Sequence, residues 1–209
     1  MNICVIPARG GSKRIPRKNI KEFQGEPIIA YSIKIALESK YFDRVIVSTD
    51  DDEIASVAEK YGAEVPFKRP CDLSNDFIGV EDVVDHAVKY IENEGKRCKY
   101  VCTLLATAPL LQKHYLIQGY EELKNSEAIN SFSATSMPFP IQRSFKLTKE
   151  GRCKMFTPEY YMCRSQDLDE AFQDAGQFYW SKRDHVSNET IFGKDSIPIL
   201  LPRYLVQDI

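Results

Sequence analysis

Short apolar runs alternate with longer segments of helical periodicity over the first two thirds of the chain. The apolar runs are rich in β-branched residues and predict buried strands at residues 2–6, 44–48, 63–67, 100–105 and 128–134. Between them, apolar residues recur at a spacing of three and four, which predicts helices beginning at Pro27, after Asp50, near Val80 and at Lys113. This βαβαβαβαβ order predicts an α/β fold, with parallel strands and helices on both faces of the sheet.

Residue types at the helix ends support these boundaries. Pro27 suits a first helical position, and Gly62 and Gly95 suit helix ends. Asp50, with Glu53 three residues later, predicts a capping box. We therefore interpret the acidic run at 50–53 as a capped helix start rather than a metal site, because carboxylates also interact favourably with a helix N-terminus.

The pattern changes at about residue 137. The segment 137–175 contains prolines and several aromatic residues but no long helical period. Short extended pieces fit residues 144–147 and 154–156, and strand-like runs return at 176–180 and 197–201. We interpret 137–175 as an insertion that forms an arm, a lid or a dimer contact.

Composition narrows the class of protein. With 209 residues, 43 % of them hydrophobic, the chain is long enough to bury one sizeable core, so one domain is expected. No apolar run approaches the roughly 20 residues of a membrane span, so we expect no membrane association. The net charge of −2 argues against a general nucleic-acid binder. Six cysteines without a C-x-x-C pair or an export signal predict reduced thiols in a cytoplasmic protein, and three scattered histidines argue against zinc.

Positive charge is concentrated in the first 21 residues, which hold six Lys and Arg and no acidic residue. The basic loop 7–19 follows the first strand, and open α/β sheets bind ligands beyond the carboxyl ends of their strands. Adjacent glycines would let its backbone approach a ligand, and its cations would neutralise a polyphosphate; these residues are Gly10, Gly11, Arg9, Lys13 and Lys18. The loop is neither a Walker A motif nor G-x-G-x-x-G, which disfavours a dinucleotide redox enzyme. A solvated basic loop is the alternative interpretation.

The string A-R-G-G-S-K-R-I-P-R-K-N at residues 8–19 resembles the signature loop of the cytidylyltransferases that activate nine-carbon sugar acids. Further stretches resemble the family in the same order: residues 42–50, Arg69-Pro70 with Leu73 and Asp76, 103–109, and Gly176 with Tyr179. The resemblance covers essentially the whole chain. It implies a Rossmann-like three-layer nucleotidyltransferase fold over residues 1–209, as a single domain with an inserted arm at about 137–175. It also implies that the arm forms a homodimer.

Departures from the family pattern point to a subfamily. Ala106 stands where the family has Gln-Pro, and Ala175 stands where it has Asn. The segment 174–180 and the aromatic and proline residues at 138–145 resemble the pseudaminic acid cytidylyltransferases. We therefore expect pseudaminic acid as the sugar. The alternatives are N-acetylneuraminate as the sugar, and a non-catalytic nucleotide-binding protein of the same fold.

The implied reaction transfers CMP from CTP to the anomeric hydroxyl of the sugar acid and releases pyrophosphate. Such a transfer needs positioning and charge neutralisation more than covalent help. The resemblance places Lys18 nearest the α-phosphate and Arg9 and Lys13 on the triphosphate. It assigns nucleotide contacts to Ala8, Gly10, Gly11, Ser12, Asn19 and Arg69, and leaves open a contact from Asp50. A surface cation before a turn is the alternative for Arg69.

The resemblance also assigns the sugar and metal sites. Arg164 would bind the sugar carboxylate, and the other sugar contacts would be Ala106, Gln177 and Tyr179, the last two on one side of a strand. A surface role for Arg164 and a core role for Tyr179 are the alternatives. Asp208 would be the first of two aspartates that bind Mg²⁺, with a solvated acid as its alternative. The second aspartate would fall beyond residue 209, so we expect the native protein to continue in a C-terminal tail.

Overall fold

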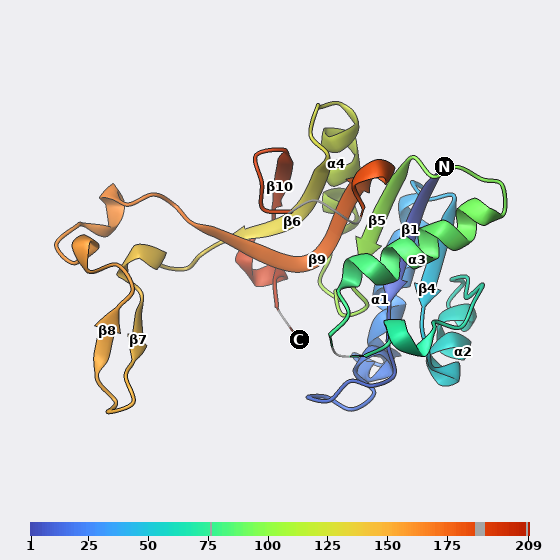
Figure 1. The fold of residues 1–209 in the computed structure, drawn as a ribbon, viewed down its shortest axis with the longest axis horizontal. Coiled ribbons are helices and arrows are strands. Elements are labelled where there is room, and N and C mark those ends of the chain that lie inside the picture. The colour runs from blue at the N-terminus through green and yellow to red at the C-terminus, as the bar shows by residue number, and fades with distance from the viewer. Residues whose placement is uncertain (76, 187–190, 208) are drawn as a thin grey trace.

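The computed structural model describes residues 1–75, 77–186, 191–207 and 209. Within these residues a central sheet of six strands has the order β10-β6-β9-β5-β1-β4 (Figure 1). The strands are β1 Asn2–Pro7, β4 Arg44–Ser48, β5 Tyr100–Leu104, β6 Asn130–Ser136, β9 Phe172–Lys182 and β10 Ser196–Leu200. β9 runs antiparallel to its neighbours β5 and β6, and the other pairings are parallel. The sheet is therefore mostly parallel, as the alternating pattern predicts.

Helices cover both faces of the sheet and complete a three-layer arrangement. They are α1 Ile28–Ser39, α2 Asp52–Lys60, α3 Val80–Asn93 and α4 Lys113–Lys124. α1, α2 and α4 share a buried cluster with Phe178 and Trp180 of β9, whereas α3 packs on the opposite face against Ile3 and Val5 of β1. Among the described residues, none of the helices combines the length and the apolar character needed to cross a bilayer.

The strand predicted at residues 63–67 does not form as a regular strand. In the described part of the chain, residues 63–67 contribute an isolated bridge between Ile46 and Glu64. Its hydrogen bonds run from Val47 N to Glu64 O at 2.9 Å and from Glu64 N to Val45 O at 2.8 Å. The prediction of a full strand is wrong because Pro66 has no N–H with which to continue the ladder.

The long loop after β1 contains more regular structure than its pattern predicts. A 3-10 turn spans Lys18–Ile20, and a small hairpin pairs β2 Glu22–Phe23 with β3 Glu26–Pro27. Gly25 adopts a φ of +87° at the hairpin turn, a conformation that favours glycine. The Tyr31 hydroxyl donates to the Phe23 carbonyl oxygen at 2.8 Å and attaches the hairpin to α1.

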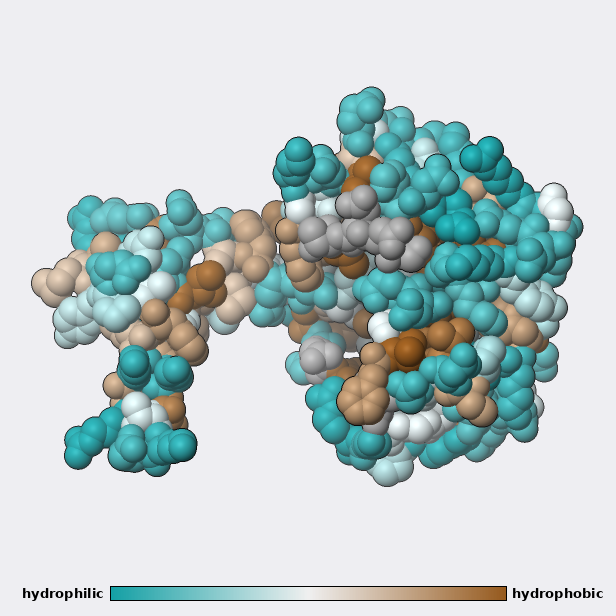
Figure 2. All heavy atoms as spheres, viewed as in Figure 1, coloured by the Kyte–Doolittle hydropathy of each residue, from teal (hydrophilic) through white to brown (hydrophobic). Residues whose placement is uncertain are grey.

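Between β6 and β9 the chain leaves the sheet as an arm, defined here as residues 137–171 (Figure 1). The extended pieces predicted within it form an antiparallel hairpin of β7 Phe145–Leu147 and β8 Cys153–Met155. Large apolar side chains on the arm are exposed, namely Phe139, Ile141, Phe145, Leu147, Phe156, Tyr160, Tyr161 and Met162. Figure 2 shows brown apolar patches along this projection.

The contact between α4 and β9 leaves no room for a side chain at Gly119. Trp180 is fully buried, stacks on Phe42 with 4.9 Å between ring centroids, and donates from Nε1 to the Leu116 carbonyl oxygen at 3.0 Å. A Cβ at position 119 would lie 2.8 Å from Cε2 of Phe178 and 3.1 Å from Cδ1 of Trp180. Glycine therefore sets the distance between helix and sheet.

We predict that Gly119→Ala lowers the free energy of unfolding by ~1–3 kcal/mol, because overpacking costs more than the gain in helix propensity. Urea denaturation monitored by circular dichroism measures the change. Gln118→Ala, at an exposed position of the same helix, is the matched control and should change it little. A Gly119→Ala variant as stable as the wild type would show that the core relaxes around the added methyl group.

Candidate functional site

A cavity of about 460 Å³ opens at the carboxyl ends of β1 and β5. Its walls come from Pro7 at the end of β1, the basic loop, Arg69, residues 105–107 after β5, and the first turn of α3. The predicted site residues among its lining are Arg9, Ser12, Lys13, Lys18, Asn19, Arg69 and Ala106. The fold thus brings Arg69, residues 105–107 and the start of α3 next to the basic loop, although they are distant from it in the sequence.

The cavity is strongly cationic. Its lining includes Arg9, Lys13, Arg14, Lys18 and Arg69, and no side-chain carboxylate among the described residues. The Lys18 ammonium donates to the Ile209 carbonyl oxygen at 2.8 Å, which brings the end of the described chain to the cavity. This concentration of positive charge is suited to a ligand with several negative charges.

Arg69 is a buried cation on the cavity wall, where only 5 % of it is exposed. Its Nε donates to the Ser48 hydroxyl at 3.1 Å, and a second guanidinium nitrogen donates to the Ser48 carbonyl oxygen. Burial lowers the pKa of Arg69 to about 10, with Asp50 acting to raise the pKa and Arg9 to lower it. The alternative interpretation of Arg69 as a surface cation is therefore wrong.

Two predicted residues of the loop, Ala8 and Asn19, make hydrogen bonds that hold its backbone. Ala8 is fully buried and continues the pairing of β1 with β4 by donating its N–H to the Ser48 carbonyl oxygen at 2.9 Å. Asn19 is buried and donates from Nδ2 to the Arg9 carbonyl oxygen at 2.9 Å. Gly11 is exposed, and a Cβ there would meet nothing within 4 Å.

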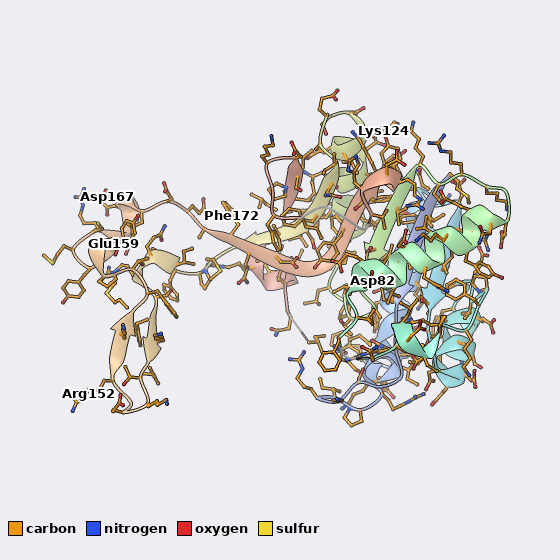
Figure 3. All side chains as sticks on the ribbon, viewed as in Figure 1. Asp82, Lys124, Arg152, Glu159, Asp167 and Phe172 are labelled. Carbon is orange, nitrogen blue, oxygen red and sulfur yellow. The ribbon has the colours of Figure 1, made fainter. Side chains whose placement is uncertain are left out.

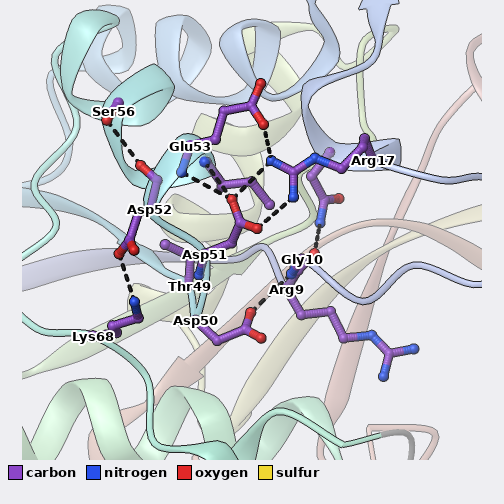
Figure 4. A network of polar contacts seen from close by, with 12 residues as sticks. Arg9, Gly10, Arg17, Thr49, Asp50, Asp51, Asp52, Glu53, Ser56 and Lys68 are labelled. Atoms are coloured by element: carbon purple, nitrogen blue, oxygen red, sulfur yellow. Dashed lines mark hydrogen bonds and ion pairs between the residues drawn. The ribbon is translucent and has the colours of Figure 1, made fainter.

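The acidic run 50–53 divides its contacts between the helix and the loop (Figure 4). The N-cap of α2 is Asp51, whose Oδ1 accepts the N–H groups of Glu53 and Ile54, each at 3.0 Å. The predicted cap, Asp50, instead accepts the N–H of Gly10 at 2.9 Å. That prediction is wrong by one residue, because a contact with a distant loop takes Asp50 away from the helix.

Asp51 also forms a bidentate ion pair with Arg17. The guanidinium nitrogens lie 2.5 Å from Oδ2 and 2.9 Å from Oδ1, and one of them also pairs with Glu53. The hydrogen bonds from Arg17, helped by those from the Ile54 and Glu53 N–H groups, lower the pKa of Asp51 to about 2. The same contacts raise the pKa of Arg17 above its ordinary value.

The predicted sugar residues other than Ala106 do not line the cavity. Gln177 is 3 % exposed and donates from Nε2 to the Leu205 carbonyl oxygen at 2.5 Å, while its Oε1 has no hydrogen-bond partner among the described residues. The Tyr179 hydroxyl donates to Asp174 at 2.6 Å. Arg164 lies on the arm and pairs with Asp167 at 2.7 Å.

Figure 3 shows how far the arm, which carries Arg164, extends from the part of the molecule that holds the cavity. Asp167 and Glu159 lie at the outer part of the arm, beyond Phe172 at its base, whereas Asp82 lies in the first turn of α3 beside the cavity. Within one chain, Arg164 and the basic loop are therefore far apart.

The predicted metal ligand, Asp208, lies outside the described residues. Within the described ranges there is no group of three or more His, Cys, Asp or Glu residues that could hold a metal ion. The neighbouring Ile209 does line the cavity. The prediction of a magnesium site therefore stays a prediction.

Sequence reasoning missed the wall that precedes and begins α3. Leu73, Asn75 and the run Ile78, Gly79, Val80 and Val83 line the cavity. These residues place the positive end of the α3 dipole beside the cations. Apart from Asn75, their side chains are apolar or absent and carry no chemical signal. Only Leu73 and Asn75 fall within a stretch that resembles the family.

Comparison with known proteins identifies the family. Residues 3–190 match the family described as cytidylyltransferase, and the chain therefore belongs to the cytidylyltransferase family. A pseudaminic acid cytidylyltransferase of Campylobacter jejuni is 46 % identical over 209 residues, 100 % of this chain and 90 % of the relative. A CMP-N,N'-diacetyllegionaminic acid synthase of the same species is 36 % identical over 199 residues, 93 % of this chain and 83 % of the relative.

The comparison with solved structures supports the same fold. A CMP:2-keto-3-deoxy-manno-octonic acid synthetase, solved in complex with CTP, superposes with a TM-score of 0.69 over 96 % of this chain and 90 % of that one. Its sequence identity is 16 %, so the likeness concerns the fold. The predicted Rossmann-like nucleotidyltransferase fold is confirmed.

The depressed pKa of Asp51 predicts a pH dependence of stability. A carboxylate whose pKa is lower in the folded state stabilises the fold above its ordinary pKa, and this stabilisation is lost as pH falls through the folded-state pKa. Asp51→Asn keeps a helix cap but loses the ion pair, so it should lower the free energy of unfolding at neutral pH. Because the Arg17 side chain is 39 % exposed, screening by solvent limits the loss to ~1 kcal/mol.

Urea unfolding of both proteins at pH 7, 4 and 3 measures the effect. The difference between wild type and Asp51→Asn should be constant from pH 7 to about 5. It should be smaller at pH 4 and smaller again at pH 3, as Asp51 becomes protonated in the unfolded and then in the folded state. A difference that is unchanged at pH 3 would contradict the assigned ion pair.

Proposed function

We propose that this protein transfers CMP from CTP to the anomeric hydroxyl of pseudaminic acid and releases pyrophosphate. The observation that carries the proposal is the cationic cavity at the carboxyl ends of β1 and β5. A triphosphate and a sugar carboxylate are both anionic, so this cavity suits them electrostatically. The choice of pseudaminic acid rests on the 46 % identity to a pseudaminic acid cytidylyltransferase.

In the proposed reaction the anomeric oxygen attacks the α-phosphorus of CTP. The new O–P bond forms as the bond from the α-phosphorus to the oxygen bridging to the β-phosphorus breaks, and pyrophosphate leaves with that oxygen. The hydroxyl proton passes to solvent. We assign Lys18 to the α-phosphate and Arg9 and Lys13 to the rest of the triphosphate, where fixed cations stabilise the charge that develops on the leaving group.

Arg69 has a different part in the proposal. Because Ser48 holds two of its guanidinium nitrogens and little of it is exposed, it is a pre-oriented charge rather than a mobile one. Such a group reorganises little when an anion arrives, which makes its interaction with the nucleotide more favourable.

We also propose that Mg²⁺ takes part. When bound, the ion would neutralise part of the charge of the triphosphate. The described lining of the cavity supplies no side-chain carboxylate for it, so the proposal rests on Asp208 and on the family resemblance. The assignments of Arg9, Lys13 and Lys18 do not depend on the ion.

We propose a cytoplasmic location, where CTP is available. All six cysteines are free thiols in the structure, and two of them, Cys4 and Cys102, are fully buried on paired strands. Free thiols suit a reducing compartment.

The first test is an assay of pyrophosphate release with CTP, Mg²⁺ and either pseudaminic acid or N-acetylneuraminate. We predict turnover with pseudaminic acid and a fall of at least about 100-fold in Lys18→Ala, the size of effect found when one oxyanion-stabilising donor is removed. Lys21→Ala removes an exposed charge from the same segment and is the matched control. Unchanged turnover in Lys18→Ala, with an unchanged melting temperature, would refute the role of Lys18. No turnover with either sugar would refute the reaction.

We further propose that the protein works as a homodimer through the arm. The arm exposes a series of large apolar side chains, and such surfaces mark protein–protein contacts. Arg164 is carried away from the cavity of its own chain, so its assigned contact with the sugar carboxylate would occur in the partner's cavity.

Mixing two inactive variants tests this arrangement. Lys18→Ala removes a cavity residue, and Arg164→Ala removes an arm residue. If each cavity receives the partner's arm, a two-fold symmetric heterodimer of these variants has one intact site, and an equal mixture should recover about a quarter of the wild-type rate. Leu147→Asp, at an exposed position of the arm, should shift the sedimentation coefficient toward that of a monomer. No recovery on mixing, with Arg164→Ala inactive by itself, would refute the contact of Arg164 with the partner's cavity.

A further inference from the structure

We propose that Arg17 and Asp51 form a clamp that holds the basic loop in the shape that binds a triphosphate. The inference deepens the proposed function and rests on it, since it assigns these two residues to positioning rather than to contact with CTP. The clamp is defined as the bidentate pair between the Arg17 guanidinium and the Asp51 carboxylate, with Glu53 on the same guanidinium.

The first observation is that the loop is attached to one helix end at both sides of its exposed part. On one side, Gly10 donates its N–H to Asp50, and a Cβ on Gly10 would lie 2.7 Å from Oδ2 of Asp51. On the other side, Arg17 pairs with Asp51 itself. Lys13 lies between these two attachments, on the exposed part of the loop.

The second observation is the backbone of Arg17. Its φ of 56° and ψ of 29° place it in the left-handed region, which is unfavourable for a residue with a Cβ. This residue immediately precedes the 3-10 turn Lys18–Ile20, so its conformation sets the direction of Lys18. The ion pair stabilises a conformation that the backbone alone disfavours.

The third observation is that the side chain of Arg17 is turned away from the ligand. Figure 4 shows its guanidinium on Asp51 and Glu53, whereas the Arg9 side chain extends in another direction. Arg9 lines the cavity, and Arg17 is not part of its described lining. Arg17 belongs to the signature loop, yet it pairs with Asp51 and Glu53 and does not line the cavity proposed to bind the phosphates.

Two substitutions each remove the ion pair of the clamp but keep the other structural role of the residue that is changed. Asp51→Asn keeps an oxygen that can cap α2 through the Glu53 and Ile54 N–H groups, and loses the charge that pairs with Arg17. Arg17→Gly keeps the left-handed backbone without strain and removes the guanidinium. Asp52→Asn is the control, because Asp52 stands at the same helix end but pairs with the exposed Lys68.

The experiment measures steady-state kinetics and amide hydrogen exchange on the full chain. We expect Asp51→Asn and Arg17→Gly each to raise KM for CTP about tenfold, equivalent to ~1.4 kcal/mol. KM for the sugar acid should change much less, and the melting temperature should fall by only about 2–4 °C, as the loss of stability predicted above implies. The double variant should be no worse than either single one, because each removes the same interaction. In the ligand-free protein, amides of residues 10–18 should exchange faster in both variants and remain unchanged in Asp52→Asn.

Several results would overturn the clamp. An unchanged KM for CTP in both variants, additive effects in the double variant, or loop amides that exchange as slowly as in the wild type would each contradict it. A wild-type protein that releases no pyrophosphate with any sugar acid would refute the proposed reaction instead. In that case the exchange measurement still decides whether the clamp exists, since it needs no substrate.

Discussion

Mutual repulsion among like charges is the constraint on which the arrangement of this site depends. Among the described residues, Arg9, Lys13, Arg14, Lys18 and Arg69 converge on one cavity whose lining provides no side-chain carboxylate. Charges so close together in a partly buried space oppose folding unless their backbone is held by other interactions. The protein supplies these interactions from outside the cavity, through Asp50 on the loop backbone and Ser48 on Arg69. Negative charge outside the cavity lining thus holds the loop backbone, and the cations line the cavity.

The same division is visible along the acidic run that begins α2. Its first three residues are consecutive in sequence, yet each of them makes a different kind of contact. Asp50 accepts a loop N–H, Asp51 caps the helix and pairs with an arginine, and Asp52 pairs with an exposed lysine. A helix N-terminus attracts carboxylates, which explains why several lie there. The tertiary contact decides which of them becomes the cap.

Much of the fold could be predicted from the sequence because it is set by local periodicity. The parallel strands, the helices between them and the basic loop after β1 all follow from spacing and from the residues that end each element. The predictions that failed did so for two reasons, one local to the strand and one a contact between distant segments. Pro66 reduces a strand to a bridge, and Gly10 draws Asp50 away from the helix.

The cavity residues that could be predicted from the sequence are mainly its cations, together with Ser12, Asn19 and Ala106. Arg9, Lys13, Lys18 and Arg69 do line the cavity, whereas the apolar wall at the start of α3 gave no signal. The position of Arg164 was beyond reach for a further reason. Nothing in the sequence states the direction in which an arm leaves a sheet, and that direction separates Arg164 from the cavity of its own chain.

Strand β9 gives the molecule a mechanical property. It is hydrogen-bonded on both sides within the sheet, and its first residues continue into the arm. A strand held in this way resists sliding, because many hydrogen bonds must break together when it is pulled along its length. The Gln177 carbonyl of this strand accepts the N–H of Leu105, which lines the cavity. The arm is therefore joined to the wall of the site through one continuous strand that is hydrogen-bonded within the central sheet.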